Sequence, residues 1–222
     1  MDNLLKKIVW LFVIAPAVYL AFVWKRLPEK VAMHFDWHGN VDRYGSKREL
    51  ITMVIILTVV SAATYLLLTN IYRIDPKKYA ADNKTRLQRI GFGVTVFLSA
   101  VVCMLIYSST HGNMKFNARF ILAGVGLMFA FLGNYMHNNK PNYFAGFRLP
   151  WTLENEDNWK KTHSLAGKIW FGGGLLVAIA CLLIQDTKTS IMVFFSITVI
   201  MTIIPIVYSY RLYREQKTLH NS

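Results

Sequence analysis

The chain has 222 residues, of which 54% are hydrophobic, 14% aromatic and only 17% charged. This composition excludes an intrinsically disordered or a fibrous protein. A formal net charge of +13 would favour nucleic-acid binding in a soluble protein, but the 25 Lys and Arg residues lie almost entirely between apolar blocks. Membrane topology requires that distribution, so we expect the chain to contact a lipid bilayer and to make no direct contact with nucleic acid.

Six apolar segments are about as long as the ~20 residues that a helix needs to cross a bilayer. They cover residues 8–24, 51–71, 90–109, 116–136, 165–184 and 191–210. The sequence therefore predicts an all-α, polytopic membrane protein with about six transmembrane helices. The first segment follows two lysines, as in a signal peptide, but it lacks a convincing small-residue cleavage site, so we expect a retained helix.

The loops between these segments differ in their content of Lys and Arg. The N-terminus, segments 71–89 and 137–168 and the C-terminal tail carry 16 basic residues, against 9 in the loops of the other side. Because basic loops stay in the cytoplasm, we expect both termini and the 137–168 loop inside the cell, and the 25–50 loop outside. The predicted organisation has four parts, which are 1–71, 72–136, 137–210 and a basic tail at 211–222.

The polar stretch from 138 to 168 contains more turn-forming and aromatic residues than a simple connector needs. Prolines and a glycine interrupt regular structure there, at Pro141, Gly146 and Pro150. Aromatic rings that suit a membrane–water interface surround them, at Tyr143, Phe144, Phe147 and Trp151. Arg148 lies among these rings, where its guanidinium could hold a phosphate or carboxylate group.

A helix is expected to begin after this turn-rich stretch. Thr152 or Asn155 can cap its N-terminus, and the acidic residues that follow suit the positive end of a helix dipole. Three residues one turn apart then share a face of this helix, namely Trp159, His163 and Gly167.

Residues 142–153, NYFAGFRLPWTL, together with Trp159, His163 and Gly167 downstream, closely resemble the signature of the SdpI family. Phe147 and Leu149 stand where that pattern often has Ile and Thr. The family consists of bacterial membrane proteins whose namesake gives immunity to a secreted toxic peptide and also transmits a signal. The resemblance implies a place in the bacterial cytoplasmic membrane, and it marks as candidate binding residues Asn142, Tyr143, Gly146, Arg148, Pro150, Trp151, Thr152, Trp159, His163 and Gly167.

The first loop, residues 27–47, resembles a small domain of unknown function that commonly precedes the SdpI signature. The hallmark of that domain is matched by Pro28, His34, Phe35, Gly39, Asp42, Ser46 and Lys47. Asp36 stands where the family often has Asn, and His38 is additional. We expect a short extended piece at 31–35 and a turn at 39–40.

The same loop raises the question of a metal site. In an extended chain His34, Asp36 and His38 would point to one side, and with Asp42 they could ligate zinc. The alternative, which we favour, is that His34 and Asp42 bond backbone groups and hold the turns of the loop. We accordingly predict no cofactor.

Recognisable catalytic motifs are missing from the sequence. It contains no H-E-x-x-H, G-x-S-x-G, Walker or G-x-G-x-x-G pattern, and no serine, cysteine or carboxylate is spaced to form a nucleophilic set with His163. Gly124, Gly126 and the glycines at 172–174 lie in apolar runs, which we interpret as close helix-packing surfaces. We predict no catalytic residues and no enzyme activity.

Two short triplets suggest an internal repeat. Arg-Leu-Pro opens the loop at 26–28 and recurs at 148–150, so the chain could consist of two three-helix halves of opposite orientation, a design found in transporters.

The family resemblance implies a membrane immunity or sensor protein that binds a membrane-active toxic peptide and signals to, or sequesters, a cytoplasmic repressor. The alternative is a small membrane transporter or an intramembrane enzyme that acts on peptide or lipid. A third possibility is an envelope-stress membrane protein with no immunity function of its own.

Overall fold

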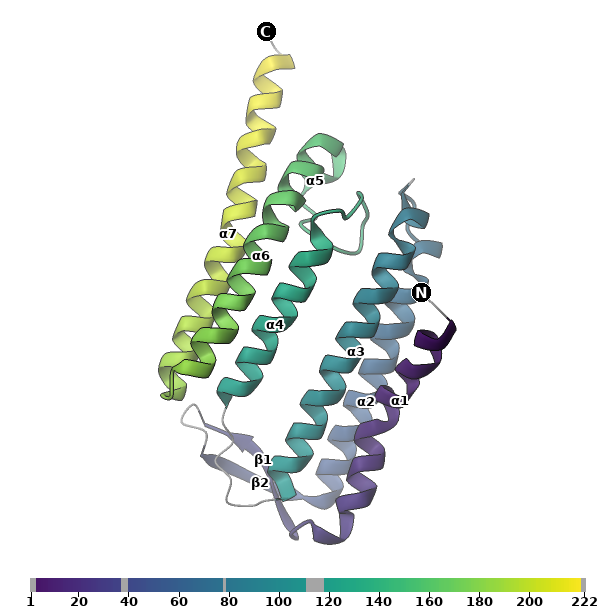
Figure 1. Ribbon diagram of the computed structural model, residues 1–222, viewed down its shortest axis with the longest axis vertical. Coiled ribbons are helices and arrows are strands. Elements are labelled where there is room, and N and C mark those ends of the chain that lie inside the picture. Colours follow the sequence, from purple (N-terminus) through teal and green to yellow (C-terminus); the bar gives the residue numbers. More distant parts are fainter. Residues whose placement is uncertain (1–2, 37–39, 78, 111–117, 221–222) are drawn as a thin grey trace.

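The computed structural model describes residues 3–36, 40–77, 79–110 and 118–220. Its long helices are α1 (Asn3–Val23), α2 (Lys47–Asn70), α3 (Ala80–Thr110), α4 (Ala118–Met136), α6 (Glu156–Leu183) and α7 (Thr187–His220) (Figure 1). In the described part of the chain, 6 helices are long and apolar enough to cross a membrane. The predicted all-α, six-helix membrane fold is confirmed.

Several helices continue beyond the apolar segments that predicted them. Helix α3 begins at Ala80, α6 begins at Glu156 and α7 runs on to His220, whereas hydropathy marked only 90–109, 165–184 and 191–210. The added turns are polar, so they extend past the apolar core. Asn155 caps α6, because its side chain accepts the N–H of Asn158 at 2.9 Å. Asn155 is one of the two caps that the sequence predicted.

The first loop folds into an antiparallel hairpin of β1 (Lys30–Phe35) and β2 (Val41–Ser46). The expected extended piece is thus confirmed, and its partner strand was not predicted. Ser46 forms a capping box with Glu49 at the start of α2, with Glu49 N donating to Ser46 Oγ at 3.3 Å. Ser109 Oγ donates to Ala32 O at 3.2 Å, so the hairpin also rests on the end of α3.

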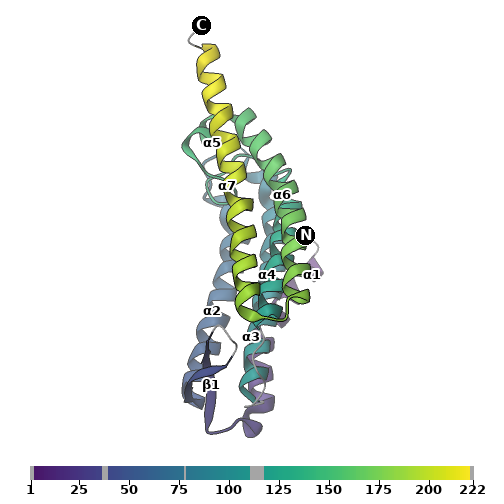
Figure 2. The ribbon, with the colours of Figure 1, turned by 90° about the vertical axis from the view of Figure 1, so that its left-hand side faces the viewer.

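The helices form two groups of three, α1–α2–α3 and α4–α6–α7 (Figures 1 and 2). In the first group the most extensive contacts are those of α3, its third helix, whereas in the second group they are those of α6, its second helix. An inverted repeat would place equivalent helices at the centre of both groups. The packing therefore does not support the repeat suggested by the Arg-Leu-Pro triplets.

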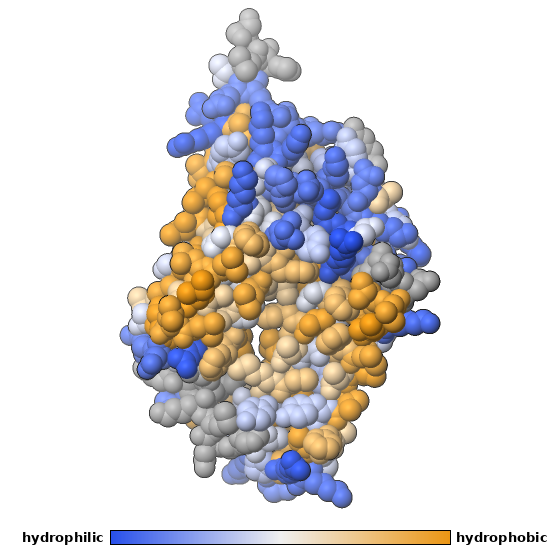
Figure 3. Space-filling view, in the orientation of Figure 1, coloured by the Kyte–Doolittle hydropathy of each residue, from blue (hydrophilic) through white to orange (hydrophobic). Residues whose placement is uncertain are grey.

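The two long loops lie at opposite ends of the bundle, the hairpin at one end and the segment between α4 and α6 at the other (Figure 1). Apolar side chains cover the middle of the surface and hydrophilic ones cover the ends (Figure 3). A buried apolar cluster joins the hairpin to the first helix group, formed by Leu20, Val23, Leu27, Val31, Leu50, Val54, Val102 and Ile106. The arrangement fits a bilayer around the middle of the bundle.

Helices α4 and α6 approach each other through glycines. A Cβ built on Gly126 would lie 2.8 Å from the carbonyl oxygen of Gly174, and one built on Gly133 would lie 2.8 Å from that of Gly167. The two backbones are therefore in contact, as small residues allow in membrane helix pairs. This confirms the packing interpretation for Gly126 and Gly174, whereas Gly172 has no atom within 4 Å of its Cβ position.

Replacing Gly174 by alanine should force α4 and α6 apart, because the new Cβ would overlap the backbone of Ala130 and Gly126. We expect Gly174→Ala to lower the free energy of unfolding by about 1–3 kcal/mol, the usual cost of overpacking. Thermal unfolding in detergent measures this as a lower melting temperature. The control Gly172→Ala should leave stability unchanged or slightly raised, because alanine favours a helix over glycine. Equal melting temperatures of the two variants would contradict the close contact.

Candidate functional site

The signature segment joins α4 to α6 at the end of the bundle away from the hairpin (Figure 1). The connector between α2 and α3 holds it from the side. Lys77 Nζ donates to Leu153 O at 2.9 Å, and Asn83 of α3 bonds both the N–H and the carbonyl of Lys140 at 3.1 Å. Two polar segments that are far apart in the sequence thus form one end of the molecule.

Asn142 is fully buried and shapes the turn of the signature. Its Oδ1 accepts the N–H groups of Phe144 at 2.9 Å and Ala145 at 2.7 Å. Its Nδ2 donates to Lys140 O at 2.8 Å, and Asn139 Nδ2 donates to Ala145 O at 2.8 Å. Because both amides satisfy neighbouring backbone groups, they fix the path of a chain that no helix supports.

His163 is fully buried one turn after Trp159 and stacks on its indole, with the ring centroids 3.9 Å apart. Its Nδ1 donates to Trp159 O at 2.8 Å, and its Nε2 accepts the N–H of Phe147 at 2.9 Å. These partners define a neutral imidazole that carries its proton on Nδ1. Gly146 has a φ of 114° and its Cβ position overlaps His163, so both conformation and space require glycine there.

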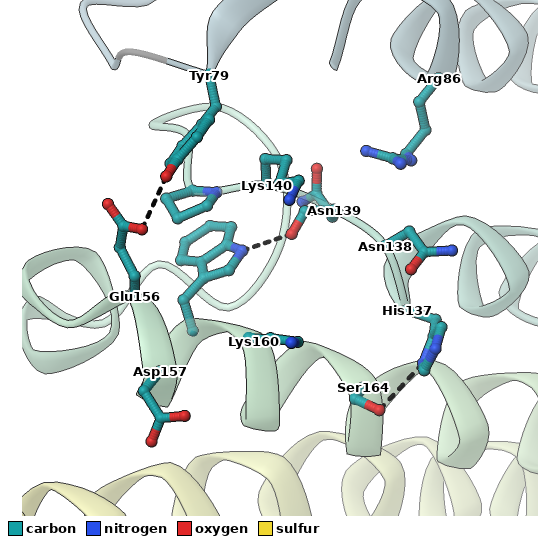
Figure 4. A pocket seen from close by; sticks show the side chains of 12 residues that line it. Tyr79, Arg86, His137, Asn138, Asn139, Lys140, Glu156, Asp157, Lys160 and Ser164 are labelled. Atoms are coloured by element: carbon teal, nitrogen blue, oxygen red, sulfur yellow. Dashed lines mark hydrogen bonds between the residues drawn. The ribbon is translucent and has the colours of Figure 1, made fainter. Parts of the chain in front are cut away.

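Trp159 connects the start of α6 to the turn around Asn142. Its Nε1 donates to Asn139 O at 2.7 Å (Figure 4), which ties the first turns of α6 to the turn that Asn142 organises. Gly167, two turns further along α6, lies against the backbone of α4, where its Cβ position is 2.9 Å from Gly133 O. The predicted shared face of Trp159, His163 and Gly167 is confirmed, and all three are buried.

The second half of the signature docks on α7. Trp151 Nε1 donates to Ser209 Oγ at 3.1 Å, and the Trp151 ring stacks on Tyr213 with centroids 5.8 Å apart. Asn158 is fully buried and donates to Ser209 O at 2.9 Å. Ser209 therefore receives two side chains of the signature region, one on its hydroxyl and one on its carbonyl.

A short helix, α5 (Pro150–Glu154), connects these contacts, with Pro150 in its first turn. The hydroxyl of Thr152 accepts the N–H of Leu149 at 3.0 Å and donates to Phe147 O at 2.7 Å. Thr152 thus closes the turn before α5. It does not cap α6, although the sequence allowed Thr152 or Asn155 as the cap.

Among the exposed side chains of the signature, Tyr143 and Arg148 lie next to each other. Arg148 Nη1 donates to the carbonyl oxygen of Tyr143 at 2.7 Å, and the ammonium of Lys77 lies 5.1 Å from the centre of the Tyr143 ring. Tyr143 is 43% exposed. The signature therefore combines a buried framework with a small exposed face that contains Tyr143 and Arg148.

A cavity of about 530 Å³ opens beside this framework (Figure 4). Its lining includes Arg86 of α3, His137 and Lys140 of the signature segment, and Lys160 and Ser164 of α6. His137 Nδ1 and Ser164 Oγ are 3.0 Å apart and bonded. The cavity collects polar groups from three separate segments at the end of the bundle.

At the hairpin, His34 and Asp42 bond each other, with Nδ1 and Oδ1 2.6 Å apart. The interpretation that both bond backbone groups is corrected, because the register of the strands brings the two side chains together. Asp36 does bond backbone, accepting the N–H of Asn40 at 2.8 Å. No group of three or more metal-ligating side chains occurs among the described residues, and His38 lies outside them.

The remaining loop residues play local roles in the described structure. Phe35 ends β1 opposite Val41, and exposed Pro28 precedes the strand. Lys47 Nζ bonds Glu29 at 3.0 Å, Ser46 caps α2 as above, and Gly39 lies outside the described residues.

Residues 138–209 match the model of the SdpI/YfhL protein family. This region is thus similar to that family. Residues 11–59 match a domain of unknown function, DUF1648, so both resemblances found in the sequence are confirmed. The chain is 24% identical over 158 residues to "Immunity protein SdpI" of Bacillus subtilis (strain 168), covering 71% of this chain and 72% of that protein. No solved structure matches. The protein is an SdpI-like, multi-pass membrane protein.

Some residues that build the SdpI signature region were not singled out by sequence reasoning. Asn139, Asn83, Asn158 and Ser209 are all buried and bonded to distant parts of the chain. The available signal was weak, because each lies in a polar segment or at the end of an apolar one, where polar residues are common. Only their partners, which lie up to 58 positions away, distinguish them.

We expect His163→Phe to loosen the signature turn while keeping the stacked ring. The variant leaves the N–H of Phe147 without its acceptor, which costs about 1–3 kcal/mol for a buried group. Thermal unfolding in detergent should show a lower melting temperature, and limited proteolysis should cut faster between α4 and α5. The control His137→Phe loses one exposed bond and should change stability by no more than about 0.5 kcal/mol. Unchanged proteolysis of His163→Phe would contradict the positioning role of His163.

Proposed function

We propose that this protein is an SdpI-like immunity protein, which protects its membrane against a membrane-active toxic peptide and reports the encounter to a cytoplasmic repressor. The observation that carries the proposal is the similarity to Immunity protein SdpI over most of both chains. The two family regions also support it, since residues 11–59 lie in the first helix group with the hairpin and residues 138–209 lie in the signature segment and the second helix group.

The proposed mechanism is binding without covalent chemistry. His163 is the ordinary candidate for a general base in the signature, but both of its ring nitrogens are bonded to backbone groups of the protein. A base must be able to reach the proton that it removes. The buried residues of the signature instead hold Tyr143 and Arg148 in place, as a recognition surface requires.

The toxin would meet the hairpin end, which the proposed topology places outside. A groove of about 460 Å³ lies between the hairpin and α2, lined by apolar Met33, Met53 and Ile56 together with Arg48 and Glu49. Flexible methionines adapt to varied apolar partners, and the charged pair offers contacts to the polar face of an amphipathic peptide.

Helix α3 offers a physical connection between the two ends. Ser109, in its last turn, bonds Ala32 of the hairpin, and Asn83, in its first turn, bonds Lys140 of the signature segment. We propose that a peptide bound at the hairpin shifts α3, and that the signature face around Tyr143 and Arg148 then docks the repressor.

Transport of a peptide or lipid is the second candidate function. The observation that favours it is an apolar cavity of about 300 Å³ between the two helix groups. Substrate-dependent flux by the purified protein in liposomes would support a transporter, and binding without flux would support the immunity protein.

The immunity function can be tested in a Bacillus subtilis strain without its own SdpI, exposed to the secreted toxic peptide that the family's namesake resists. Wild-type protein should restore survival. Arg148→Ala should weaken the response of the repressor to the toxin about tenfold or more, because one charge-assisted hydrogen bond contributes about 1.5–3 kcal/mol to binding of the repressor. Arg89→Ala, which removes an exposed arginine from the same end, should retain this response. A full repressor response in Arg148→Ala at normal membrane abundance would remove the signature face from the proposal.

The proposed orientation can be tested with single cysteines, Tyr44→Cys in β2 and Glu154→Cys in α5, in a Cys103→Ala, Cys181→Ala background. A membrane-impermeant maleimide added to intact cells should label the Tyr44→Cys variant and not the Glu154→Cys variant. The reverse pattern would place the signature outside, as the toxin contact. Labelling of both variants would contradict the odd number of membrane crossings, made by α2, α3 and α4, that separates the hairpin from the signature segment.

A further inference from the structure

Three basic residues line the cavity beside the signature, namely Arg86, Lys140 and Lys160. Figure 4 shows Arg86 and Lys160 extending into the space from α3 and from α6. Arg86 is half-buried, and its Nη1 donates to Asn83 Oδ1 at 2.8 Å. Within the part of the chain that the structure describes, no carboxylate forms an ion pair with any of the three.

The acidic residues of the cavity are already engaged. Glu156 accepts the hydroxyl of Tyr79 at 2.9 Å. Asp157 forms an ion pair with Lys161 at 2.8 Å, and it lies within 3.4 Å of Gln216 on α7. A cluster of positive charge at the edge of a bilayer is costly unless an anion faces it. Three basic side chains face two carboxylates in this cavity, and Asp82 acts on Arg86 from one turn earlier on α3, so an anion from outside the chain would complete the balance of charge.

The second cavity, of about 300 Å³, lies on the apolar side of the same structure. Asn139 lines both cavities, and Leu87 and Ile90 follow Arg86 along α3 into the second one. Its other walls include Leu132 of α4, and Phe147 and Trp170 near the signature. Figure 3 shows the surface hollowed between the two apolar helix groups, below the hydrophilic end. A basic cavity thus adjoins an apolar one where the hydrophilic end of the bundle meets its apolar middle.

We propose that the two cavities together bind one anionic phospholipid. The phosphate lies among Arg86, Lys140 and Lys160, and one acyl chain occupies the apolar cavity between the helix groups. A soluble anion would use only the first cavity and a neutral lipid only the second. The adjoining pair fits a molecule that carries both groups, and basic pockets between membrane helices bind lipid headgroups in this way.

The test is native mass spectrometry of the full-length protein purified in detergent, with phosphatidylglycerol and phosphatidylcholine that carry identical chains. Wild-type protein should retain phosphatidylglycerol preferentially. Lys140→Gln and Lys160→Gln should each weaken this preference about fivefold, the factor that corresponds to ~1 kcal/mol per basic side chain near a lipid. Arg86→Gln should do the same, and Arg86→Lys, which keeps the charge, should preserve most of the preference.

The controls are Arg89→Gln and Lys168→Gln, which remove exposed basic residues of the same two helices that line neither cavity. Both should bind like wild type. Equal retention of the two lipids, or an unchanged preference in the cavity variants, would overturn the proposal. Displacement of the lipid by millimolar inorganic phosphate would assign the cavity to a soluble anion. Binding of an acidic peptide without a lipid preference would assign it to a protein partner, and either result overturns the lipid site.

Discussion

The contact between the backbones of α4 and α6 supports the rest of the signature end. Gly133 lies one turn before α4 ends, and it meets Gly167 on α6. At this separation the indole of Trp159 reaches the carbonyl of Asn139, just past the end of α4. A side chain between the helices would move that indole away, and the turn around Asn142 would lose its anchor on α6. A packing feature within the membrane thus positions a polar structure at its edge.

The second constraint is the low polarity of the surroundings at the membrane edge, where the signature segment lies. Irregular backbone near a bilayer is tolerated only where the protein itself satisfies its polar groups. Asn142, Asn139, Thr152 and His163 meet this requirement by bonding backbone N–H and carbonyl groups of the signature segment. Their residue types therefore follow from the shape of the turn, and they are positioning residues. Contacts with a partner are left to the side chains that remain exposed, such as Tyr143 and Arg148.

The two ends of the molecule differ in chemistry as well as in place. The hairpin end offers an apolar groove with two charged residues in its lining, which suits an amphipathic peptide. The signature end offers basic side chains around a polar cavity, which suit phosphate groups. Helix α3 is bonded to both ends. The proposed toxin contact and the proposed lipid site consequently use different ends of the chain, and a substitution at one end need not affect the other.

The sequence by itself determined the membrane class, the six helices, the position of the signature and its family, because apolar length and short motifs are local properties of a chain. It also predicted the shared face of Trp159, His163 and Gly167, since a helical period fixes that face. Only the tertiary structure decided that Thr152 closes a turn while Asn155 caps α6 and that His34 pairs with Asp42, and only its packing failed to support the repeat suggested by the Arg-Leu-Pro triplets. It alone identified Asn83 and Ser209 as supports of the signature. Those features depend on how helices rotate and pack against partners many residues away, and hydropathy along one segment contains no information about that rotation.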